Sequence, residues 1–403
     1  MKILLVSQYF HPEPFLINDL VESLVRDGNE IVVYTGYPNY PDGQIYNGYN
    51  NKKFKTEFFN DTIKVYRVPI KPRKESGALN LFLNYVSFIF SGLIYSSKIK
   101  ESDFDVIFAF GLSPITSVIP AIFLKKKFKC KLSLWIQDLW PESLSVTGYI
   151  NNKSILFVTS LLVRWIYKNC DQILVQSKGF KVPVSKLTSK DLIYYPNSIH
   201  IEHNRTISQK LPKKLYNSLK DSFCLVFAGN LGKAQSLDII LDAAFNLKDI
   251  SDLKILIIGS GSLFNWLDSE INRRGINNVE LTGRYPMEIM PTVFSFAEGL
   301  IVTLKDNEIV NYTIPSKIQS YMSSGKPIIG ALNGEGAKVL NDAKCGYVTK
   351  ADCALGLESS IRKLYSLSLD KRVELGKNAN NYFDLNFNMK KQSKKLVQHL
   401  SSI

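Results

Sequence analysis

Two places in the second half of the chain combine glycine or proline with side chains that could bind an anion. Residues 227–236 read FAGNLGKAQS and follow a strand-like run. Glycines there would let backbone N–H groups approach a bound anion, and the start of the following helix adds partial positive charge. Residues 313–317 read TIPSK, where Pro315 suits a first helical turn and Ser316 and Lys317 add a hydroxyl and a cation. Together the two segments predict a diphosphate site.

A third segment, in the first half, gathers aromatic rings and carboxylates. Residues 135–143 read WIQDLWPES, so a predicted strand runs into a loop with Asp138, Trp140 and Glu142. Aromatic faces pack on sugar rings, and carboxylates accept hydrogen bonds from sugar hydroxyls. Two interpretations stay open: a binding site for a sugar acceptor, or a Trp-rich corner of the core in which the Asp caps a turn.

Patterns for metals and for common nucleotide-binding loops are absent or incomplete. The H-x-E-H at His200–His203 has no further ligands nearby in sequence, which is typical of a solvated turn. Asp103 and Asp105 form a D-x-D, but it directly precedes a strand-like run, where turns commonly hold acids. The G-S-G at 259–261 indicates a tight turn, since no third glycine completes a dinucleotide fingerprint. We therefore expect neither a metal nor another cofactor.

The elements that must position these residues alternate between short β-branched runs and helical stretches. This alternation predicts doubly wound α/β sheets, with ligands at the carboxyl ends of the strands. The expected strands are 2–7, 30–35, 63–68, 105–110, 132–136, 172–176 and 192–195, then 223–229, 254–259, 279–282, 299–304 and 326–331. We expect two Rossmann-like domains facing across a cleft: 1–196, a linker at 197–222, and 223–375, followed by a helical segment at 376–403 that could return to the first domain.

Composition narrows the class of protein and its partners. The 403 residues are 45% hydrophobic and 21% charged, as in ordinary globular proteins. The net charge of +14 indicates an acidic partner, and nucleic acid is disfavoured because no nucleic-acid motif accompanies it. Five scattered cysteines indicate free thiols in a reducing compartment. The short apolar run at the N-terminus lacks the features of a signal peptide, so we expect a cytoplasmic protein.

One apolar segment departs from the globular pattern. Residues 79–95 contain no charge but are too short and too polar in places for a comfortable membrane span. They form either a buried core helix or a helix whose apolar face dips into a bilayer while flanking lysines meet lipid phosphates. The Lys-rich run 121–131 and the apolar stretch 155–167 favour the second interpretation, although a lysine run is also typical of a solvated surface.

Taken in order, the motifs resemble those of glycosyltransferase family 4, a group of retaining enzymes with the GT-B fold. The resemblance rests on residues 7–13, 35–41 (with PNYP), 137–142 (within QDLWPES), 196–197, 228–230, 259–261, 315–317 and 325–327. It is closest to bacterial O-antigen N-acetyl-L-fucosaminyltransferases and colanic acid fucosyltransferases. Where that family commonly has an Arg/Lys pair for the donor diphosphate, this chain has Asn230 and Gln235, and Ser320 stands in place of the usual ribose-binding Glu.

The resemblance implies which residues hold the two substrates. Donor-binding residues would be Gly229, Asn230, Gly232, Lys233, Gly259, Arg284, Pro315, Ser316, Lys317 and Ser320. Acceptor-binding residues would be His11, Tyr40 and Trp140, with Asp138 and Glu142 as catalytic candidates. Lys317 is the natural replacement for the missing cation.

The implied reaction moves N-acetyl-L-fucosamine from its UDP derivative to a sugar on undecaprenyl diphosphate, for O-antigen or exopolysaccharide synthesis. The protein would be attached peripherally to the anionic inner face of the cytoplasmic membrane. The alternatives are a fucosyltransferase that uses GDP-fucose, a GT-B-fold isomerase of nucleotide sugars, and a membrane-surface scaffold with a degenerate donor site.

Overall fold

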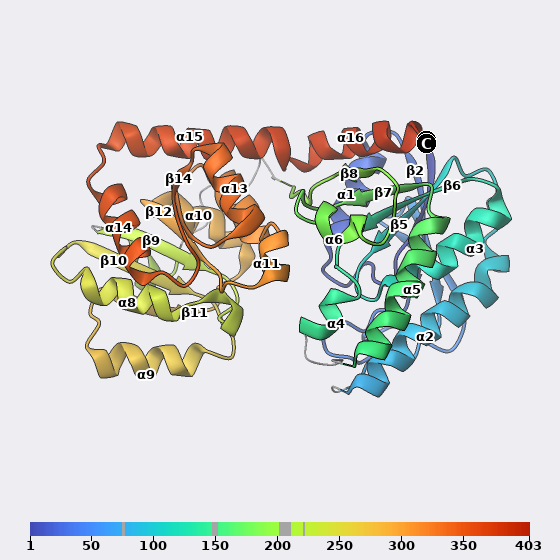
Figure 1. Ribbon diagram of the computed structural model, residues 1–403, viewed down its shortest axis with the longest axis horizontal. Helices are drawn as coiled ribbons and strands as arrows, with labels where there is room; N and C mark the ends of the chain where they lie inside the picture. Colours follow the sequence, from blue (N-terminus) through green and yellow to red (C-terminus); the bar gives the residue numbers. More distant parts are fainter. Residues whose placement is uncertain (75–76, 147–151, 201–210, 221) are drawn as a thin grey trace. The chain divides into compact units, whose positions relative to one another are not determined.

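The computed structural model describes residues 1–74, 77–146, 152–200, 211–220 and 222–403 (Figure 1). The chain divides into two compact units. The first unit is Met1–Ser198 together with Met389–Ile403, and the second is Ile199–Asn388. The first crossing lies two residues beyond the boundary expected at 196, and α7 (Lys213–Leu219), inside the stretch expected as a linker, belongs to the second unit.

The first unit is built on an eight-stranded sheet in the order β3-β4-β2-β1-β5-β6-β7-β8. All described pairs are parallel except β3–β4. Its strands are β1 (Lys2–Val6), β2 (Glu30–Gly36), β3 (Lys55–Phe59), β4 (Ile63–Val68), β5 (Val106–Gly111), β6 (Lys131–Ile136), β7 (Gln172–Val175) and β8 (Leu192–Tyr194). The central strands are buried on both faces, which explains their continuous apolar runs.

Helices cover both faces of this sheet. On one face, α1 (Leu16–Arg26) packs against α16 (Met389–Ser401) over a core that includes Val33 and Phe108. The Ser393 hydroxyl of α16 donates to Asp27 just after α1 at 2.7 Å. The other described helices of this unit are α2 (Ala78–Ile94), η1 (Tyr95–Lys98), η2 (Ile115–Val118), α3 (Ile119–Phe128), α4 (Glu142–Val146), α5 (Lys153–Asn169) and α6 (Lys181–Ser185).

The second unit has a six-stranded sheet in the order β11-β10-β9-β12-β13-β14, and all of its described pairs are parallel. Its strands are β9 (Phe223–Ala228), β10 (Leu253–Ile258), β11 (Val279–Gly283), β12 (Gly299–Thr303), β13 (Ile328–Ala331) and β14 (Gly346–Thr349). Two separate hydrophobic clusters line its two faces. Besides α7, its described helices are η3 (Lys233–Gln235), α8 (Asp238–Asn246), α9 (Phe264–Arg274), η4 (Met287–Ile289), α10 (Met290–Phe296), α11 (Glu308–Tyr312), α12 (Ser316–Ser323), α13 (Gly334–Ala343), α14 (Ala354–Tyr365) and α15 (Leu369–Asn386).

The predicted α/β class with two Rossmann-like sheets is confirmed, and every expected strand forms. The sequence did not indicate β3 and β14. Strand β3 reads KTEFF and pairs antiparallel along β4, so its partner rather than its own apolar content fixes it. The expected C-terminal helical segment is two helices, since α15 belongs to the second unit and only α16 returns to the first.

The docking of α16 on α1 gives a stability prediction. Leu396 of α16 is fully buried, so Leu396→Ala should leave a cavity and cost about 2–5 kcal/mol. Amide hydrogen exchange in α1 should become faster because the helix loses its cover. The control is Leu385→Ala on α15, whose side chain is 62% exposed. Equal exchange in α1 for both variants would contradict the placement of α16.

Candidate active site

At the carboxyl ends of β9 and β10, two loops are joined through glycine backbone. The Gly229 N–H donates to the Ile258 carbonyl at 2.9 Å, and the Leu231 N–H donates to the Ser260 carbonyl at 2.9 Å. Gly259 has φ +157°, and a Cβ there would lie 1.9 Å from the Gly229 carbonyl oxygen. A side chain at 259 would therefore push the two loops apart. The tight turn predicted at 259–261 lets residues 229–237, here called the β9 loop, lie close to the loop after β10.

The ammonium of Lys317 lies against the β9 loop. Its Nζ donates to Oε1 of Gln235 at 2.5 Å and stands 3.8 Å from the centre of the Phe227 ring. A Cβ on Gly229 would come within 3.1 Å of the same Nζ, so the glycine leaves room for the cation. In the described part of the chain, no carboxylate forms an ion pair with Lys317. Burial lowers the pKa of Lys317 to about 7.

Helix α12 presents Lys317 in its first turn and is hydrogen-bonded to β9 through Tyr321, one turn later. Pro315 precedes the helix with an extended backbone, and Ser316 is exposed at its first position. The Tyr321 hydroxyl accepts from the Ala228 N–H at 2.8 Å and donates to the Ala228 carbonyl at 3.1 Å. The free N–H groups at the start of a helix carry partial positive charge. Lys317 and the N-terminus of α12 therefore both contribute positive electrostatic potential at the same place.

The remaining predicted donor residues surround this place to different degrees. Asn230 and Lys233 are exposed on the β9 loop. A Cβ on Gly232 would lie 2.9 Å from the side-chain amide nitrogen of Asn230. Arg284 is exposed directly after β11, whose Gly283 carbonyl accepts from the Gly259 N–H at 2.9 Å. Ser320 is half-buried one turn after Ser316 on α12. No contact joins Arg284 or Lys233 to Lys317 among the described residues.

In the first unit, a buried carboxylate organises the loops after β1 and β2. Glu13 is completely buried, and its Oε1 accepts the N–H groups of Asn39 and Tyr40, both at 2.8 Å. Its Oε2 accepts the Phe10 N–H at 3.3 Å. Burial raises the pKa of Glu13 to about 7, and the three N–H donors oppose that rise. These bonds hold the predicted acceptor residue Tyr40 in place; its side chain is 37% exposed.

Arg67 also connects the loop after β1 with the end of β2. Its guanidinium is buried, pairs with Glu57, and donates to the carbonyls of His11 and Gly36. The exposed His11 ring packs on Phe59 with 4.5 Å between centroids. Burial and then the nearby Arg67 charge lower the pKa of His11. His11 and Tyr40 are thus at one edge of the sheet, each held by its backbone.

Asp138 and Trp140 converge on Ser113, which follows β5. The Ser113 N–H donates to Oδ2 of Asp138 at 2.8 Å, and Trp140 Nε1 donates to the Ser113 hydroxyl at 3.1 Å. Burial raises the pKa of Asp138, and the Ser113 N–H opposes the rise. Glu142 is half-buried at the start of α4. Trp140 is only 7% exposed, so it offers little ring surface to a sugar.

Several residues of these sites were not singled out from the sequence. Glu13 and Arg67 are internal charges, each with partners 26 or more residues away, so a local pattern does not mark them. Tyr321 reaches Ala228 across 93 residues. The amide of Gln137, at the end of β6, is 5% exposed, and its Nε2 has no hydrogen-bond partner among the described residues. The QDLWPES string was a signal for this loop, but not for that group.

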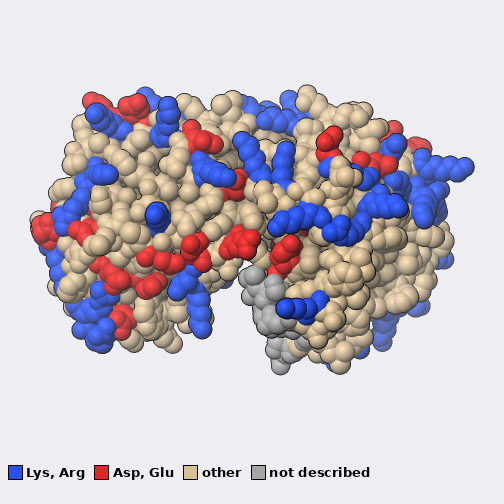
Figure 2. All heavy atoms as spheres, viewed as in Figure 1, with Lys and Arg blue, Asp and Glu red and all other residues tan. Residues whose placement is uncertain are grey.

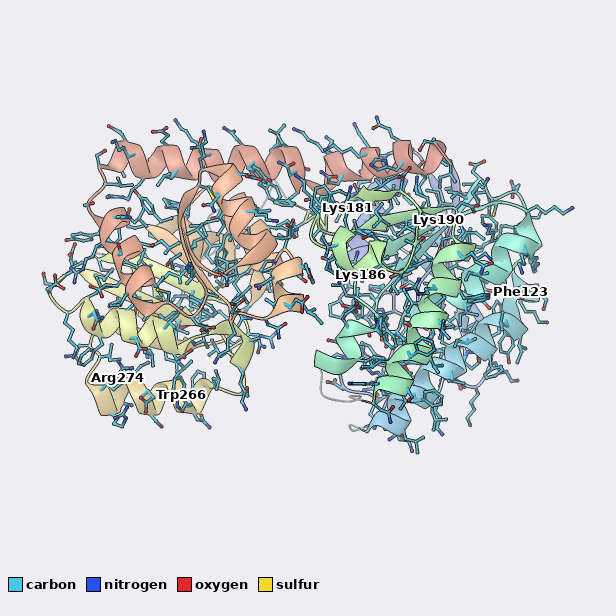
Figure 3. The ribbon with its side chains drawn as sticks, viewed as in Figure 1. Phe123, Lys181, Lys186, Lys190, Trp266 and Arg274 are labelled. Carbon is cyan, nitrogen blue, oxygen red and sulfur yellow. The ribbon has the colours of Figure 1, made fainter. Side chains whose placement is uncertain are left out.

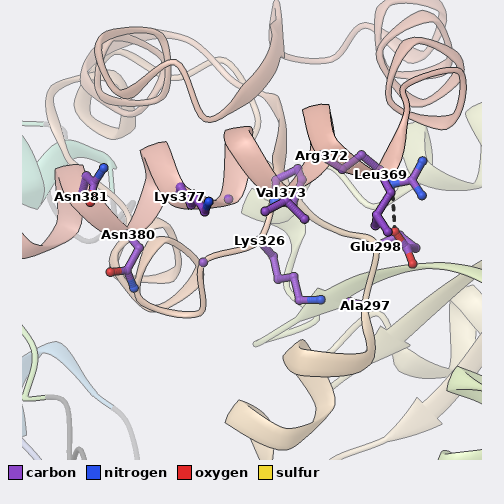
Figure 4. Close-up of a pocket in the computed structure, with 12 residues that line it drawn as sticks. Ala297, Glu298, Lys326, Leu369, Arg372, Val373, Lys377, Asn380 and Asn381 are labelled. Atoms are coloured by element: carbon purple, nitrogen blue, oxygen red, sulfur yellow. Dashed lines mark ion pairs between the residues drawn. The ribbon is translucent and has the colours of Figure 1, made fainter.

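Other features lie apart from the predicted residues. A pocket of about 320 Å³ lies beside α15 at the amino ends of β12 and β13, with Lys326 in it and an Arg372–Glu298 ion pair of 3.0 Å at its wall (Figure 4). It contains none of the predicted donor residues.

No cluster of three potential metal ligands occurs in the described part of the chain. His203 lies outside the described residues. Asp105 and Asp103 bind the backbone and side chain of Lys2, as expected for a structural turn.

Comparison with known proteins identifies the second unit. Residues 209–382 match the family model described as "Glycosyl transferases group 1". Residues 209–382 make up most of the second unit, so this unit is similar to glycosyl transferases group 1. The chain is accordingly a transferase, and the parts of the β9 loop and α12 described above lie within the matched residues.

Similar proteins agree with this assignment. The chain is 23% identical over 338 residues to a putative colanic acid biosynthesis glycosyl transferase, WcaI, of Escherichia coli K12, covering 81% of this chain and 82% of that protein. A sucrose-phosphate synthase from Thermosynechococcus elongatus has the same fold, with a TM-score of 0.73, 15% identity, and 100% and 98% of the two chains covered. Anabaena Alr3699/HepE in complex with UDP gives a TM-score of 0.69, 13% identity and full coverage of both chains. The fold is therefore GT-B, the fold of such glycosyltransferases.

The contact at Gly259 predicts that a substitution there lowers the stability of the second unit more than a substitution at other glycines with positive φ. Gly259→Ala should lower the free energy of unfolding by more than Gly275→Ala, because its Cβ meets the Gly229 carbonyl. Gly275 has φ +57° with nothing near its absent Cβ, so its substitution costs about 1–2 kcal/mol. Urea unfolding measures both. Equal costs would show that the two loops do not approach as closely as described.

The raised pKa of Glu13 predicts a dependence of stability on pH. The folded protein keeps its proton to about pH 7, whereas an unfolded Glu loses it near 4.5. The protonated folded state is therefore favoured at low pH, and this contribution is lost as pH rises from 4.5 through 7. Glu13→Gln cannot lose a proton, so its stability relative to the wild type should rise across that window.

The measurement is urea unfolding of both proteins in a Trp266→Phe background, where the other three tryptophans all report on the first unit. Asp42→Asn, at an exposed position, is the control. A difference between Glu13→Gln and the wild type that stays constant from pH 4.5 to 8 would contradict the shift.

Proposed function

We propose that this protein is a retaining glycosyltransferase that moves N-acetyl-L-fucosamine from UDP-N-acetyl-L-fucosamine to a sugar on undecaprenyl diphosphate. The product would serve O-antigen or exopolysaccharide synthesis. The observation that carries the proposal is the Lys317 ammonium, which has no carboxylate partner among the described residues and lies at the start of α12 beside Gly229. Retention follows from the resemblance to glycosyltransferase family 4.

The donor diphosphate would bind where Lys317, the β9 loop and the first turn of α12 meet. Gln235 and Asn230 stand where related enzymes commonly have cations, and the Lys317 ammonium reaches the Gln235 side chain at 2.5 Å. The charge that the sequence lacks at 230 and 235 is thus delivered by a lysine 82 residues further along the chain. The Ser316 hydroxyl and the exposed Lys233 would add polar contacts at the rim.

Transfer of the sugar makes the diphosphate a leaving group with about two negative charges, while the sugar becomes oxocarbenium-like. Preorganised cations and N–H dipoles stabilise such charge most effectively in a site that excludes water. We propose that Lys317 and the α12 N-terminus supply this stabilisation without a metal. Because the pKa of Lys317 is about 7, an arriving diphosphate would draw a proton onto it.

On the acceptor side, Asp138 is the proposed group that orients or deprotonates the attacking hydroxyl. A carboxylate with an ordinary pKa is a weak base, and burial moves the pKa of Asp138 upward, toward a useful range. The Ser113 N–H holds one of its oxygens, which fixes the direction of the other. His11, Tyr40 and Glu142 would contact the acceptor sugar from the neighbouring loops.

The identity of the sugar rests on the strings PNYP and QDLWPES and on similar proteins. WcaI is described as a colanic acid biosynthesis glycosyl transferase, which favours a polysaccharide product. The Anabaena structure contains UDP, which favours a uridine nucleotide. A fucosyltransferase that uses GDP-fucose is the second candidate, since discrimination between the two sugars requires only ~1–3 kcal/mol of pocket contacts.

We further propose that the protein works at the inner face of the cytoplasmic membrane, where an undecaprenyl-diphosphate acceptor resides. Among the described residues, one helical stretch, Leu79–Lys98, is long and apolar enough by length and composition to cross a membrane, and most of it is not buried. An isomerase acting on a free nucleotide sugar would need no such surface. Incubation with UDP-N-acetyl-L-fucosamine and lipid-linked N-acetylglucosamine, followed by mass spectrometry, separates the two: a transferase extends the lipid, and an isomerase alters the donor alone.

Replacement of Lys317 tests the donor site. Lys317→Met keeps the stem of the side chain but removes the charge, so it should weaken UDP binding about 10–100-fold at pH 6.5. Turnover at saturating donor should fall on the order of 10²–10³, since the leaving group loses its nearest cation. Titration calorimetry and a product assay measure the two effects.

The matched control is Lys233→Met, at an exposed lysine on the β9 loop. It should change UDP affinity by much less than Lys317→Met. Full turnover by Lys317→Met would remove Lys317 from the mechanism. Absence of UDP binding by the wild type at millimolar concentration would favour a scaffold with a degenerate donor site.

A further inference from the structure

Helix α2 of the first unit has its apolar side turned outward. Leu79, Phe82, Phe90 and Ile94 are 60–69% exposed and lie on one side of the helix. The opposite side, which faces the protein, carries Asn84, Phe88 and Gly92, all of them buried. A surface helix of a globular protein normally has the reverse arrangement, with polar groups toward water. This helix is therefore built to face something other than water.

Hydrogen bonds on the inward side of α2 connect the helix to the loops after β1 and β4 and to β2. The Asn84 amide accepts from Gln8 Nε2 at 2.8 Å and donates to the Lys71 carbonyl at 2.6 Å. Further along, Gly92 leaves room for Pro120 of α3, which a Cβ would meet at 2.7 Å, and its carbonyl accepts from the Tyr34 hydroxyl at 2.7 Å. The outward residues thus stay exposed because the inward polar bonds hold the helix in this rotation.

A second helix extends the exposed apolar surface. On α5, Phe157, Val158, Leu161 and Trp165 are 44–64% exposed. Helix α3 packs against both α2 and α5, so all three cover the same side of the sheet, and Phe123 of α3 is 46% exposed on its outer side (Figure 3). The surface formed by the exposed apolar residues of α2 and α5 is called the α2–α5 face. In Figure 2, the part of the first unit over these helices is largely free of charge.

Basic side chains border the α2–α5 face. Lys98 follows α2, Lys126 lies on α3, and Arg164 and Lys168 lie on α5; all four are exposed. No described carboxylate forms an ion pair with any of them. Apolar residues ringed by lysines complement an anionic bilayer, where the rings enter the acyl region and the ammonium groups meet phosphates.

The start of α2 lies at the edge that carries the predicted acceptor residues. Helices that follow parallel strands begin at the carboxyl ends of those strands, and both α2 and α5 do so (Figure 1). Just before α2, the Arg73 guanidinium lies 5.4 Å from the centre of the Tyr40 ring, and the Arg73 N–H donates to the Asn39 side chain at 3.2 Å. Among the described acids, none forms an ion pair with Arg73.

A buried group without a partner lies at the same place. Gln8 is 2% exposed, and its Oε1 has no hydrogen-bond partner among the described residues, although its Nε2 binds Asn84. This edge therefore holds a guanidinium and an amide oxygen that have no described ion-pair or hydrogen-bond partner, respectively, beside an exposed aromatic ring. Arg binds phosphate oxygens through its fork of donors, and its position beside the apolar start of α2 suits a ligand with an anionic head and a long apolar tail.

We propose that the α2–α5 face lies on an anionic bilayer and that Arg73, resting on Tyr40, binds the diphosphate of a lipid-linked acceptor whose tail remains in that bilayer. This inference rests on the proposed function, because it names the site for the acceptor's diphosphate. The bilayer then does two things at once: it covers the exposed rings and presents the head group to the edge where Asp138 and Tyr40 lie.

Vesicle binding tests the face without any enzymatic assay. The full-length protein should sediment with phosphatidylcholine–phosphatidylglycerol vesicles at low salt and much less with phosphatidylcholine alone. The pair Leu79→Glu and Phe82→Glu should reduce this binding about tenfold or more. Leu355→Glu, at a residue 72% exposed in the second unit, is the matched control and should bind like the wild type.

Tryptophan quenching shows which side meets the lipid. Trp165 lies on the α2–α5 face and is 44% exposed, whereas Trp266, on α9 of the second unit, is 41% exposed (Figure 3). Brominated lipids should quench the fluorescence of the wild type and of Trp266→Phe, but not that of Trp165→Phe. Quenching that disappears only in Trp266→Phe would overturn the proposed orientation.

Arg73 is tested with undecaprenyl diphosphate added to the same vesicles. The wild type should bind the doped vesicles more tightly than the plain ones, and Arg73→Gln should lose that gain. Lys74→Gln, next to it and exposed, loses the same charge and should keep the gain. If both variants lost the gain in binding equally, Arg73 would act only as general surface charge, and the proposed diphosphate site would be wrong.

Other outcomes are distinguishable from a failure of the donor site. If the wild type binds UDP but no vesicle, the proposed donor chemistry stands and this inference fails. If it forms a dimer in solution that Leu79→Glu and Phe82→Glu break, a second copy covers the face, and the membrane proposal is wrong.

Discussion

The half-buried ammonium of Lys317, which forms no ion pair with a described carboxylate, is the feature on which the proposed donor site depends. An ammonium group next to a ring face and a neutral amide is costly to charge, and its pKa falls to about 7. With a pKa near 7, the group is only partly protonated at neutral pH, so an incoming diphosphate would favour its charged form. The glycines at 229 and 259 leave space for the lysine and for the loop crossing, and Tyr321 fixes the helix that carries it.

In the first unit, by contrast, the buried charges of Glu13 and Arg67 are hydrogen-bonded to the backbone. Glu13 and Arg67 are internal charges that bind backbone groups of the loops after β1 and β2, and they leave the aromatic and polar side chains of those loops toward the outside. Polar bonds also face inward on α2, through Asn84 and Gly92, so that the apolar residues of this helix are presented outward. In both places, buried polar contacts determine which side chains are exposed on the surface.

Sequence patterns predicted most strands of the two sheets because buried parallel strands are continuous apolar runs, as Leu132–Ile136 illustrates, but they missed β3 and β14. They also predicted Lys317 as the replacement cation, and the fold shows that its ammonium reaches Gln235; its role in donor binding stays a prediction. The rotation of α2 could not be read from residues 79–95, since a helix apolar on nearly every side has no preferred face until Asn84 finds its partners. Glu13 could not be recognised because its burial arises from residues 39 and 40, which approach it only in the folded sheet.

The most direct test of this account is the proton balance of nucleotide binding. Calorimetric titration with UDP at pH 7.5, in two buffers of different ionisation enthalpy, gives the number of protons taken up on binding. With a free pKa of about 7 for Lys317, the wild type should take up a substantial fraction of one proton, and Lys317→Met should take up correspondingly less. Equal proton uptake by the two proteins, or none by the wild type, would contradict the role assigned to Lys317.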